Sequence, residues 1–264
     1  MKRDSREGVV DALARQALLL EPGERCSISR LRSAAFGADA SRAPITEDVV
    51  FSLLEACEES GVLLDAPDGW DGRGEAVGFA DIDAADPVGE GGEFTARRIV
   101  NGRRGPVVLD EVERLVFKLV ASEGGFESDF ELRLVRKGHR LARFVLPSTC
   151  LFAVPGKPCR AKHGALSADE YAGLARVLGE CSVERWRRSY YAPILDGLQW
   201  GLRIDLADGD VVLCDGSNDY PEGFDVLRRH LTRLAGVADS ADRPPKVSRS
   251  VRNALRLARR LRLR

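Results

Sequence analysis

One stretch, residues 196–206, constrains the fold of this chain more than any other. Every second position from 198 onward is apolar, and the positions between are polar or small. The apolar set is Leu198, Trp200, Leu202, Ile204 and Leu206. Such alternation is typical of a strand with one buried and one solvated face. Asp208 and Gly209 then favour a tight turn into a returning strand, so the sequence predicts a hairpin with Trp200 in its core.

The segments around this hairpin predict an α+β domain over residues 107–236. Three further strands are expected in an antiparallel meander, at 114–121, 130–134 and 140–146. Ser167 and Glu170 form a capping box ahead of one helix, and Asn218 or Asp219 is placed to cap a second. We expect the order β-β-β-α-β-β-α, which is a five-stranded antiparallel sheet with helices on one face.

Residues 1–85 resemble a winged-helix module in their element order. Apolar stripes predict three helices followed by two short strands, at 5–20, 29–36, 46–60, 62–65 and 76–80. The resemblance implies DNA binding through the third helix. That helix carries five acids, and no Lys or Arg occurs from 43 to 72. Because DNA phosphates would repel such a helix, we expect a protein-binding or packing module instead.

Residues 86–106 are predicted to be a linker. They include five glycines, and no apolar periodicity runs through them. The segment also carries four arginines: Arg97, Arg98, Arg103 and Arg104. We expect these to be solvated charges, and contact with nucleic acid is the alternative.

The second half of the α+β domain carries an extended motif. It begins Asp196-Gly197-x-x-Trp200-x-Leu202-x-Ile204 and, after Asp208-Gly209, continues Gly216-Ser217-Asn218-x-Tyr220-Pro221-x-x-Phe224-x-x-Leu227. With Gly124-Gly125-Phe126 and Trp186 upstream, residues 112–236 resemble a family of uncharacterised bacterial α+β domains. The resemblance implies a fold and no reaction.

Charge is distributed unevenly along the chain. The 264 residues carry a net charge of −1, yet residues 243–264 hold nine Lys or Arg and no acid, which leaves −10 on the rest. We expect residues 237–264 to form a hinge and a basic amphipathic tail. Its candidate contacts with an anionic partner are Arg249, Arg252, Arg256, Arg259 and Arg260. That partner is a nucleic acid, an anionic membrane surface or the chain's own acidic third helix.

Residues with catalytic or metal-binding chemistry are scattered. The histidines His139, His163 and His230 are expected in surface or packing roles, since a catalytic histidine needs an orienting partner. Cys150, Cys159 and His163 fit no common zinc spacing. Four acids surround the hairpin, where turn formation is a simpler role than cation binding: Asp205, Asp208, Asp210 and Asp215. We therefore predict no enzymatic activity, no metal and no cofactor.

An apolar run of membrane-spanning or signal-peptide length is absent from the sequence, so we expect a cytoplasmic protein with reduced cysteines. Exposed Arg and Tyr are favoured at interfaces, which gives a candidate interaction surface of Arg187, Arg188, Tyr190, Tyr191, Asn218 and Tyr220. The predicted function is a non-catalytic binding or scaffolding protein with a protein partner and no indicated small-molecule ligand. The alternatives are a nucleic-acid-associated regulator that uses the linker and tail, and a membrane-surface protein that uses the tail.

Overall fold

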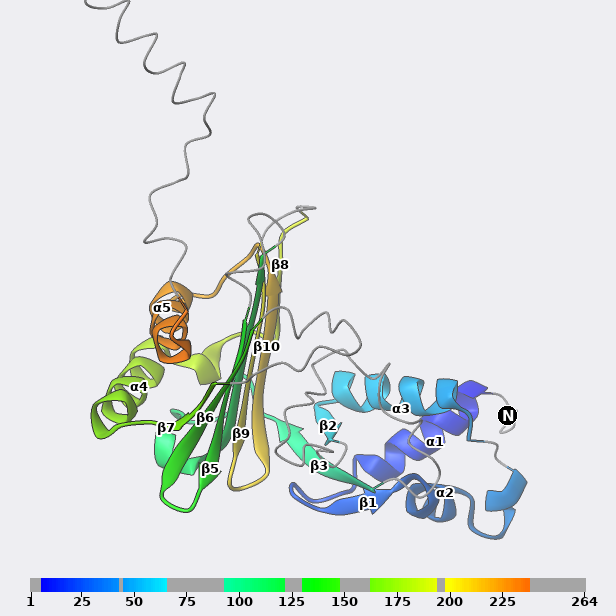
Figure 1. Cartoon of the computed structure of the whole chain (residues 1–264). Helices are drawn as coiled ribbons and strands as arrows, with labels where there is room; N and C mark the ends of the chain where they lie inside the picture. The colour runs from blue at the N-terminus through cyan, green and yellow to red at the C-terminus, as the bar shows by residue number, and fades with distance from the viewer. Residues whose placement is uncertain are drawn as a thin grey trace, which may run out of the picture.

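The computed structural model describes residues 6–42, 45–65, 93–121, 130–147, 162–193 and 198–237, which form an α+β protein (Figure 1). Its α-helices are α1 (Arg6–Ala17), α2 (Ile28–Phe36), α3 (Glu47–Glu59), α4 (Ala168–Cys181) and α5 (Phe224–Ala235). Its strands are β1 (Arg25–Ser27), β2 (Val62–Asp65), β3 (Glu93–Ile99), β4 (Val112–Ala121), β5 (Phe130–Lys137), β6 (Arg140–Pro147), β7 (Lys162–Ala165), β8 (Ser189–Tyr191), β9 (Leu198–Leu206) and β10 (Asp210–Ser217).

These strands belong to one mixed sheet. Its order is β1-β3-β10-β9-β4-β5-β6-β7, with β2 beside β3 and β8 beside β10. Most neighbours are antiparallel, but β3 and β8 both run parallel to β10. The predicted hairpin is β9 and β10, with Ile204 opposite Val212. Gly209 turns it at φ 82°, and a Cβ there would lie 2.6 Å from the Pro22 backbone, so both conformation and space require glycine.

The prediction of five strands is wrong in number, because the sheet has ten. The five expected segments do form β4, β5, β6, β9 and β10. The other strands are short, such as the four-residue β7 and the three-residue β8, or belong to the N-terminal part of the chain. Strands β7 and β8 are too short to display a recognisable alternation, so the sequence pattern does not reveal them. Strand β2 is the strand predicted at 62–65.

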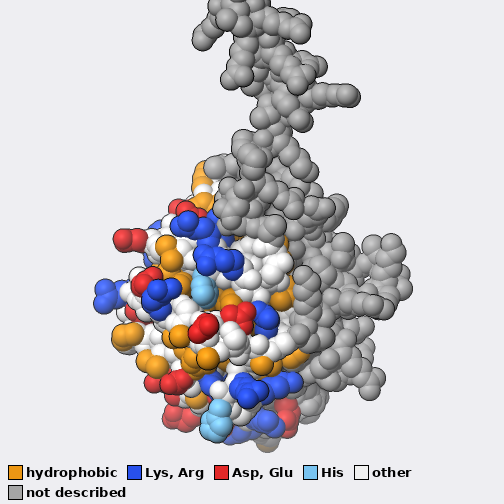
Figure 2. All heavy atoms as spheres, turned by 60° about the vertical axis from the view of Figure 1, so that its left-hand side comes forward, with side chains coloured by type: hydrophobic (Ala, Val, Ile, Leu, Met, Phe, Trp, Pro, Cys, Tyr) orange, Lys and Arg blue, Asp and Glu red, His pale blue; other side chains and the backbone are white. Residues whose placement is uncertain are grey.

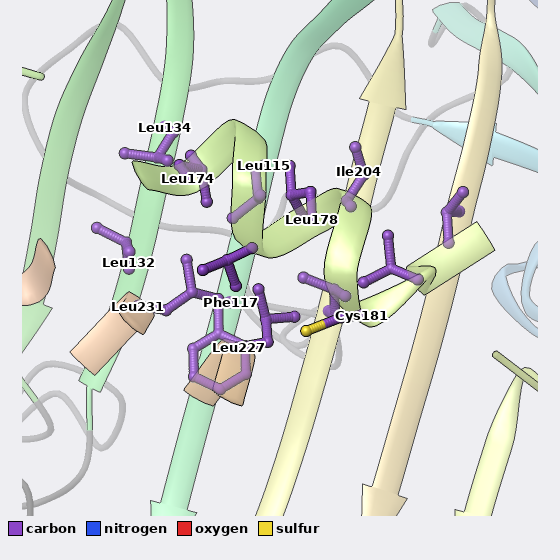
Figure 3. Packing of buried hydrophobic residues seen from close by; sticks show 14 of the residues in the cluster. Leu115, Phe117, Leu132, Leu134, Leu174, Leu178, Cys181, Ile204, Leu227 and Leu231 are labelled. Atoms are coloured by element: carbon purple, nitrogen blue, oxygen red, sulfur yellow. The ribbon is translucent and has the colours of Figure 1, made fainter. Parts of the chain in front are cut away.

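Helices α4 and α5 cover one face of the sheet, as predicted (Figure 1). The Ser167–Glu170 capping box begins α4, and both of its reciprocal hydrogen bonds are present. Figure 3 shows leucines of both helices pointing toward Leu115 and Phe117 of β4. Those leucines are Leu174, Leu178, Leu227 and Leu231, and all are 0% exposed. Each buried side chain of this size contributes about 1.5–3 kcal/mol.

On the outer side of α4 and α5, hydrophobic, basic and acidic side chains are interspersed (Figure 2). Such a mixed surface is ordinary for a solvated helix face. None of the described helices is both long and apolar enough to cross a bilayer.

A second core lies between α1, α2 and α3 and the strands β1, β2 and β3. Its largest buried side chains are Leu13, Ile28, Leu31, Leu53 and Phe94. Strand β3 lies between β1 and β2 and is antiparallel to both. This strand occupies residues 93–99, within the range expected to be a linker, because Phe94 and Ala96 alternate into the core. The linker is therefore shorter than expected, and the strand predicted at 76–80 lies outside the described residues.

Strand β3 also joins the N-terminal segment to the rest of the sheet. Arg98 and Ile99 pair in parallel with Asp210 and Val211 of β10. Ile99, Val211 and Leu213 form a small buried cluster at this junction. Two paired residues and one small cluster are a narrow connection, so charged side chains nearby carry much of the contact, as described below.

Candidate functional site

The candidate interaction surface is built over an aromatic cluster at one end of the sheet. Trp200 of β9 lies at the centre, with ring centroids 6.0 Å from Trp186, 5.9 Å from Tyr190 and 4.6 Å from Phe224. The Trp186 and Trp200 rings meet edge to face at 82°. Trp200 is 4% exposed, which confirms its predicted place in the core. Pairs of this geometry are worth about 0.5–1.5 kcal/mol beyond their buried area.

Trp200 also fixes the loop that follows β10. Its Nε1 donates a hydrogen bond to the Asp219 carbonyl at 3.1 Å. The ring lies against Gly216, where a Cβ would be 2.2 Å from Nε1. Asn218 adopts φ 58°, and its Oδ1 accepts a hydrogen bond from Leu198 N at 2.8 Å. Asn tolerates this left-handed conformation, and only glycine leaves room for the Trp200 ring at position 216. The geometry of the loop therefore accounts for the residue types at 216 and 218.

Asn218 and Asp219 do not cap the last helix, so that prediction is wrong. Helix α5 begins at Phe224, and its N-cap is Gly223 at φ 82°. The Asn218 side chain joins β9 to the loop instead. Asn at a left-handed position suits a turn as well as a helix cap, and the local sequence does not separate the two.

Three of the six candidate surface residues present side chains to solvent. Tyr191 is 72% exposed, and Tyr220 is 42% exposed with its ring stacked on Phe224 at 4.9 Å. The Arg187 guanidinium lies 4.8 Å above the Tyr190 ring and 4.0 Å from Asp219. We call Arg187, Tyr191 and Tyr220 the edge group.

The other three candidates have structural roles. Tyr190 is 8% exposed, and its hydroxyl accepts a hydrogen bond from Arg187 N. Arg188 donates to the Glu58 carbonyl at 2.7 Å and pairs with the Glu58 carboxylate, which joins β8 to α3. Asn218 braces the loop, as described above. Since Tyr190 faces the core, the next residue, Tyr191, projects from the opposite face of the sheet.

The face of the sheet opposite α4 and α5 carries a cluster of charged residues that we call the charge cluster. It comprises Asp65 of β2, Arg97 of β3, Arg114 of β4, and Arg203 and Asp205 of β9. Asp65 Oδ2 lies 2.5 Å from Arg203 Nη2, 2.9 Å from Arg114 Nη2 and 3.4 Å from Arg97 Nε. Asp205 accepts from Arg203 Nε at 2.8 Å and also pairs with Arg114.

This arrangement corrects the prediction of a solvated face on β9. Gly201 and Asp205 are buried, Arg203 is half-buried, and the Asp205 side chain is 1% exposed. Burial alone would raise the pKa of Asp65, but Arg203, Arg114 and Arg97 outweigh it and hold that pKa below its usual value. Burial alone would lower the pKa of Arg203, but Asp205 and Asp65 raise it. Asp65 and Arg203 thus each favour the ionised form in the folded protein.

A second buried pair lies on the same face. Glu131 and Arg133 of β5 form an ion pair, with side chains 1% and 10% exposed. Glu131 Oε2 has no hydrogen-bond partner in the described part of the chain. Two charged strand residues are therefore buried on this face of the sheet.

The arginines of the expected linker pair mainly with acids of the hairpin. Arg98 lies 2.7 Å from Asp210, and Arg104 contacts Asp208 at 2.6 Å and Asp210 at 3.3 Å. The carboxylates considered for cation binding thus have arginine partners, and Asp215 accepts from the Ser189 hydroxyl. Within the described ranges, no group of three or more His, Cys, Asp or Glu is arranged to hold a metal ion.

The remaining candidates divide between packing positions and undescribed parts of the chain. His139 is exposed in the β5–β6 turn, and His230 is half-buried between α5 and Gly173 of α4. Four cysteines are free and buried: Cys26, Cys57, Cys181 and Cys214. Outside the described residues lie Cys150, Cys159 and the tail arginines Arg249, Arg252, Arg256, Arg259 and Arg260. The side chain of His163 is likewise not described.

Comparison with protein-family models finds no match for this chain, and comparison with curated proteins finds none either. The resemblance to a bacterial α+β family over residues 112–236 accordingly stays a prediction.

Proposed function

We propose that this chain is a non-catalytic binding or scaffolding protein whose partner protein contacts the edge group. The observation that carries the proposal is the edge group itself: Tyr220 and Arg187 are exposed and pack on the rings of Phe224 and Tyr190, and the exposed Tyr191 lies at the same end of the sheet on its other face. Tyr and Arg supply large contact area with little loss of conformational freedom, which is why both are enriched at interfaces.

The distribution of charge elsewhere supports a binding role over a catalytic one. The buried Asp and Arg side chains of the charge cluster satisfy each other, and the aspartates of the hairpin pair with arginines. Active sites usually hold a group whose pKa is poised near neutrality. In the charge cluster the pKa of Asp65 lies below, and that of Arg203 above, its ordinary value, so both stay ionised near neutral pH.

We propose further that residues 6–99 act as a winged-helix-like module that packs against the sheet. The element order α1-β1-α2-α3-β2-β3, with β3 between β1 and β2, supports this interpretation. Helix α3 directs Glu58 to Arg188 of the sheet domain. In this arrangement α3 serves as a packing element, and its acids disfavour contact with DNA phosphates.

The test is capture of partners from the native host by the immobilised full chain. A variant carrying Tyr191→Ala and Tyr220→Ala is expected to lose at least about tenfold in capture, in line with the loss of two interface anchors. Val226→Ala is the matched control, since Val226 is also exposed, at 40%, but is not part of the edge group. Equal capture by wild type and the double variant would contradict the proposal.

The second candidate function is a nucleic-acid-associated regulator that uses the tail. The charge asymmetry favours it: nine basic residues at 243–264 against −10 on the rest of the chain. Duplex DNA titrated at two salt concentrations tests it, because phosphate contacts give an affinity that falls steeply with salt. Binding that is absent at low salt, or independent of salt, rules this candidate out.

A further inference from the structure

Strand β8 lies at an edge of the sheet that the described residues form, beside the edge group. Among the described strands it pairs with β10 alone, through Ser189–Asp215, Tyr190–Gly216 and Tyr191–Ser217. Hydrogen bonds from Asp215 N to Arg188 O and from Ala192 N to Ser217 O fix which backbone groups face β10. Since these groups alternate along a strand, the N–H and C=O of Ser189 and Tyr191 point away from the sheet.

These outward groups are accessible. Ser189 is exposed and Tyr191 is 72% exposed, and in the described part of the chain their backbone N–H groups donate no hydrogen bond to an acceptor outside the sheet. An unpaired strand edge is a ready template for a further strand, and proteins commonly protect it by shortness or by proline. Here β8 is three residues long and Pro193 follows it closely, so an added strand is confined to a short stretch.

The charge beside this edge indicates the chemistry of the occupant. Three arginines in four residues lead into β8, and two have highly exposed side chains: Arg185 at 82% and Arg187 at 74%. Each has an acidic neighbour near the distance limit of an ion pair. Arg185 Nε lies 3.8 Å from Glu184 Oε1, and Arg187 Nη2 lies 4.0 Å from Asp219 Oδ2. The Arg187–Asp219 pair is exposed on both sides, so it contributes little and leaves the Arg187 guanidinium able to bind another carboxylate. Arg185 is itself highly exposed, although its partner Glu184 is buried.

We propose that the β8 edge binds an extended acidic segment of a partner protein by strand addition. The segment pairs with the outward backbone groups of Ser189 and Tyr191. It places a β-branched or aromatic side chain beside Tyr191, which is a favourable cross-strand pair, and a carboxylate toward Arg185 or Arg187. This inference rests on the proposed function and specifies the partner of the edge group.

The experiment is a selection from displayed random seven-residue peptides on the immobilised full chain. We expect the selected peptides to combine acids with β-branched or aromatic residues and to protect the Ser189 and Tyr191 amides from hydrogen exchange. Tyr191→Pro removes one outward N–H while leaving the bonds to β10 in place, and Tyr191→Val removes the same ring but keeps the N–H. The affinity for the selected peptides should be at least about tenfold lower in Tyr191→Pro than in wild type. In Tyr191→Val it should differ from wild type by no more than about threefold.

Failure of the edge inference is separable from failure of the proposed function. Selected peptides that lack acids, that bind Tyr191→Pro as well as Tyr191→Val, or that leave both amides unprotected overturn the inference, and so does the absence of any enrichment. A host partner lost equally in Tyr191→Val and Tyr191→Pro overturns strand addition but leaves the edge group as the interface. Circular dichroism confirms that Tyr191→Pro is folded before any of these comparisons.

Discussion

Arg203 donates two hydrogen bonds to Asp65, at 3.0 and 2.5 Å, across 138 residues of sequence. The pair joins β9 in the middle of the sheet to β2 of the N-terminal segment. Because the parallel contact of β3 with β10 spans only two residue pairs, this bidentate interaction is a major part of the connection between the two cores.

Replacement of Asp65 is expected to destabilise the whole protein. Asp65→Asn leaves Arg97, Arg114 and Arg203 in a half-buried site with one acid in place of two, and loss of one partner of such a cluster typically costs about 3–5 kcal/mol. Urea denaturation measures the loss. The control is Glu24→Gln, which breaks an ion pair with the 58% exposed Arg30 and is expected to leave the denaturation midpoint almost unchanged.

The same carboxylate predicts a loss of stability in acid. The pKa of Asp65 is lowered in the folded state, so its contribution is fully present above the unfolded value of about 4 and is lost as the pH falls through the folded value. The free energy of unfolding should therefore fall below about pH 4 more steeply in wild type than in Asp65→Asn. Parallel pH profiles for the two proteins would contradict this assignment.

Gly216→Ala should disturb the aromatic cluster. A Cβ at this position would lie 2.2 Å from Trp200 Nε1, so the ring has to move, and overpacking of this kind costs about 1–3 kcal/mol. A change in tryptophan fluorescence should accompany the loss. Gly179→Ala in α4 is the matched control: a Cβ there meets nothing within 4 Å, and alanine is favoured over glycine in a helix by about 0.5–1 kcal/mol.

His230 predicts a separate pH effect near neutrality. Burial, followed by the positive charges of Arg233 and Arg176, lowers the pKa of His230, although Glu170 opposes the shift. As the pH falls, His230 is therefore protonated in the unfolded chain before it is protonated in the folded protein. The free energy of unfolding falls as the pH drops below about 6.5 toward the lower pKa of the folded state. His230→Gln should flatten the dependence of the unfolding free energy on pH between about pH 7.5 and 5.5, measured by urea denaturation at each pH.

Two cysteines are expected to resist alkylation. Burial raises the pKa of Cys57 and of Cys214 to about 12, so little thiolate is present at pH 8. Mass spectrometry after iodoacetamide treatment should find both unmodified in the native protein and modified in urea. Native labelling as fast as unfolded labelling would show that these sites open readily.

The alternation of β9 was sufficient to predict the hairpin, its turn at Gly209 and the buried position of Trp200. Ser167 and Glu170 likewise identified the start of α4. Both are local signals, because the residues that define them are neighbours in sequence or lie at a fixed spacing. The order of the predicted elements indicated that both helices lie on one face of the sheet.

The charge cluster could not be predicted from the sequence, because its members are far apart along the chain. Alternation shows that Arg203 and Asp205 share a face of β9, but not that Asp65 and Arg97 come to cover that face. Polar residues that alternate along a strand usually face solvent, so the prediction of a solvated face on β9 was wrong. Among the six candidate surface residues, the exposure of Tyr191 was predicted from its residue type. The structural role of Arg188 was not, because its partner Glu58 of α3 lies 130 residues away in sequence.

The parallel contact between β3 and β10 has a consequence for synthesis on the ribosome. Strand β10 is made more than a hundred residues after β3, so the α1–α3 core emerges and can pack well before its docking strand exists. Until then, the edge of β3 at Arg98 and Ile99 lacks its β10 partner, and an unpaired strand edge of this kind is prone to pair with other chains. Completion of the final hairpin closes the two halves into one sheet.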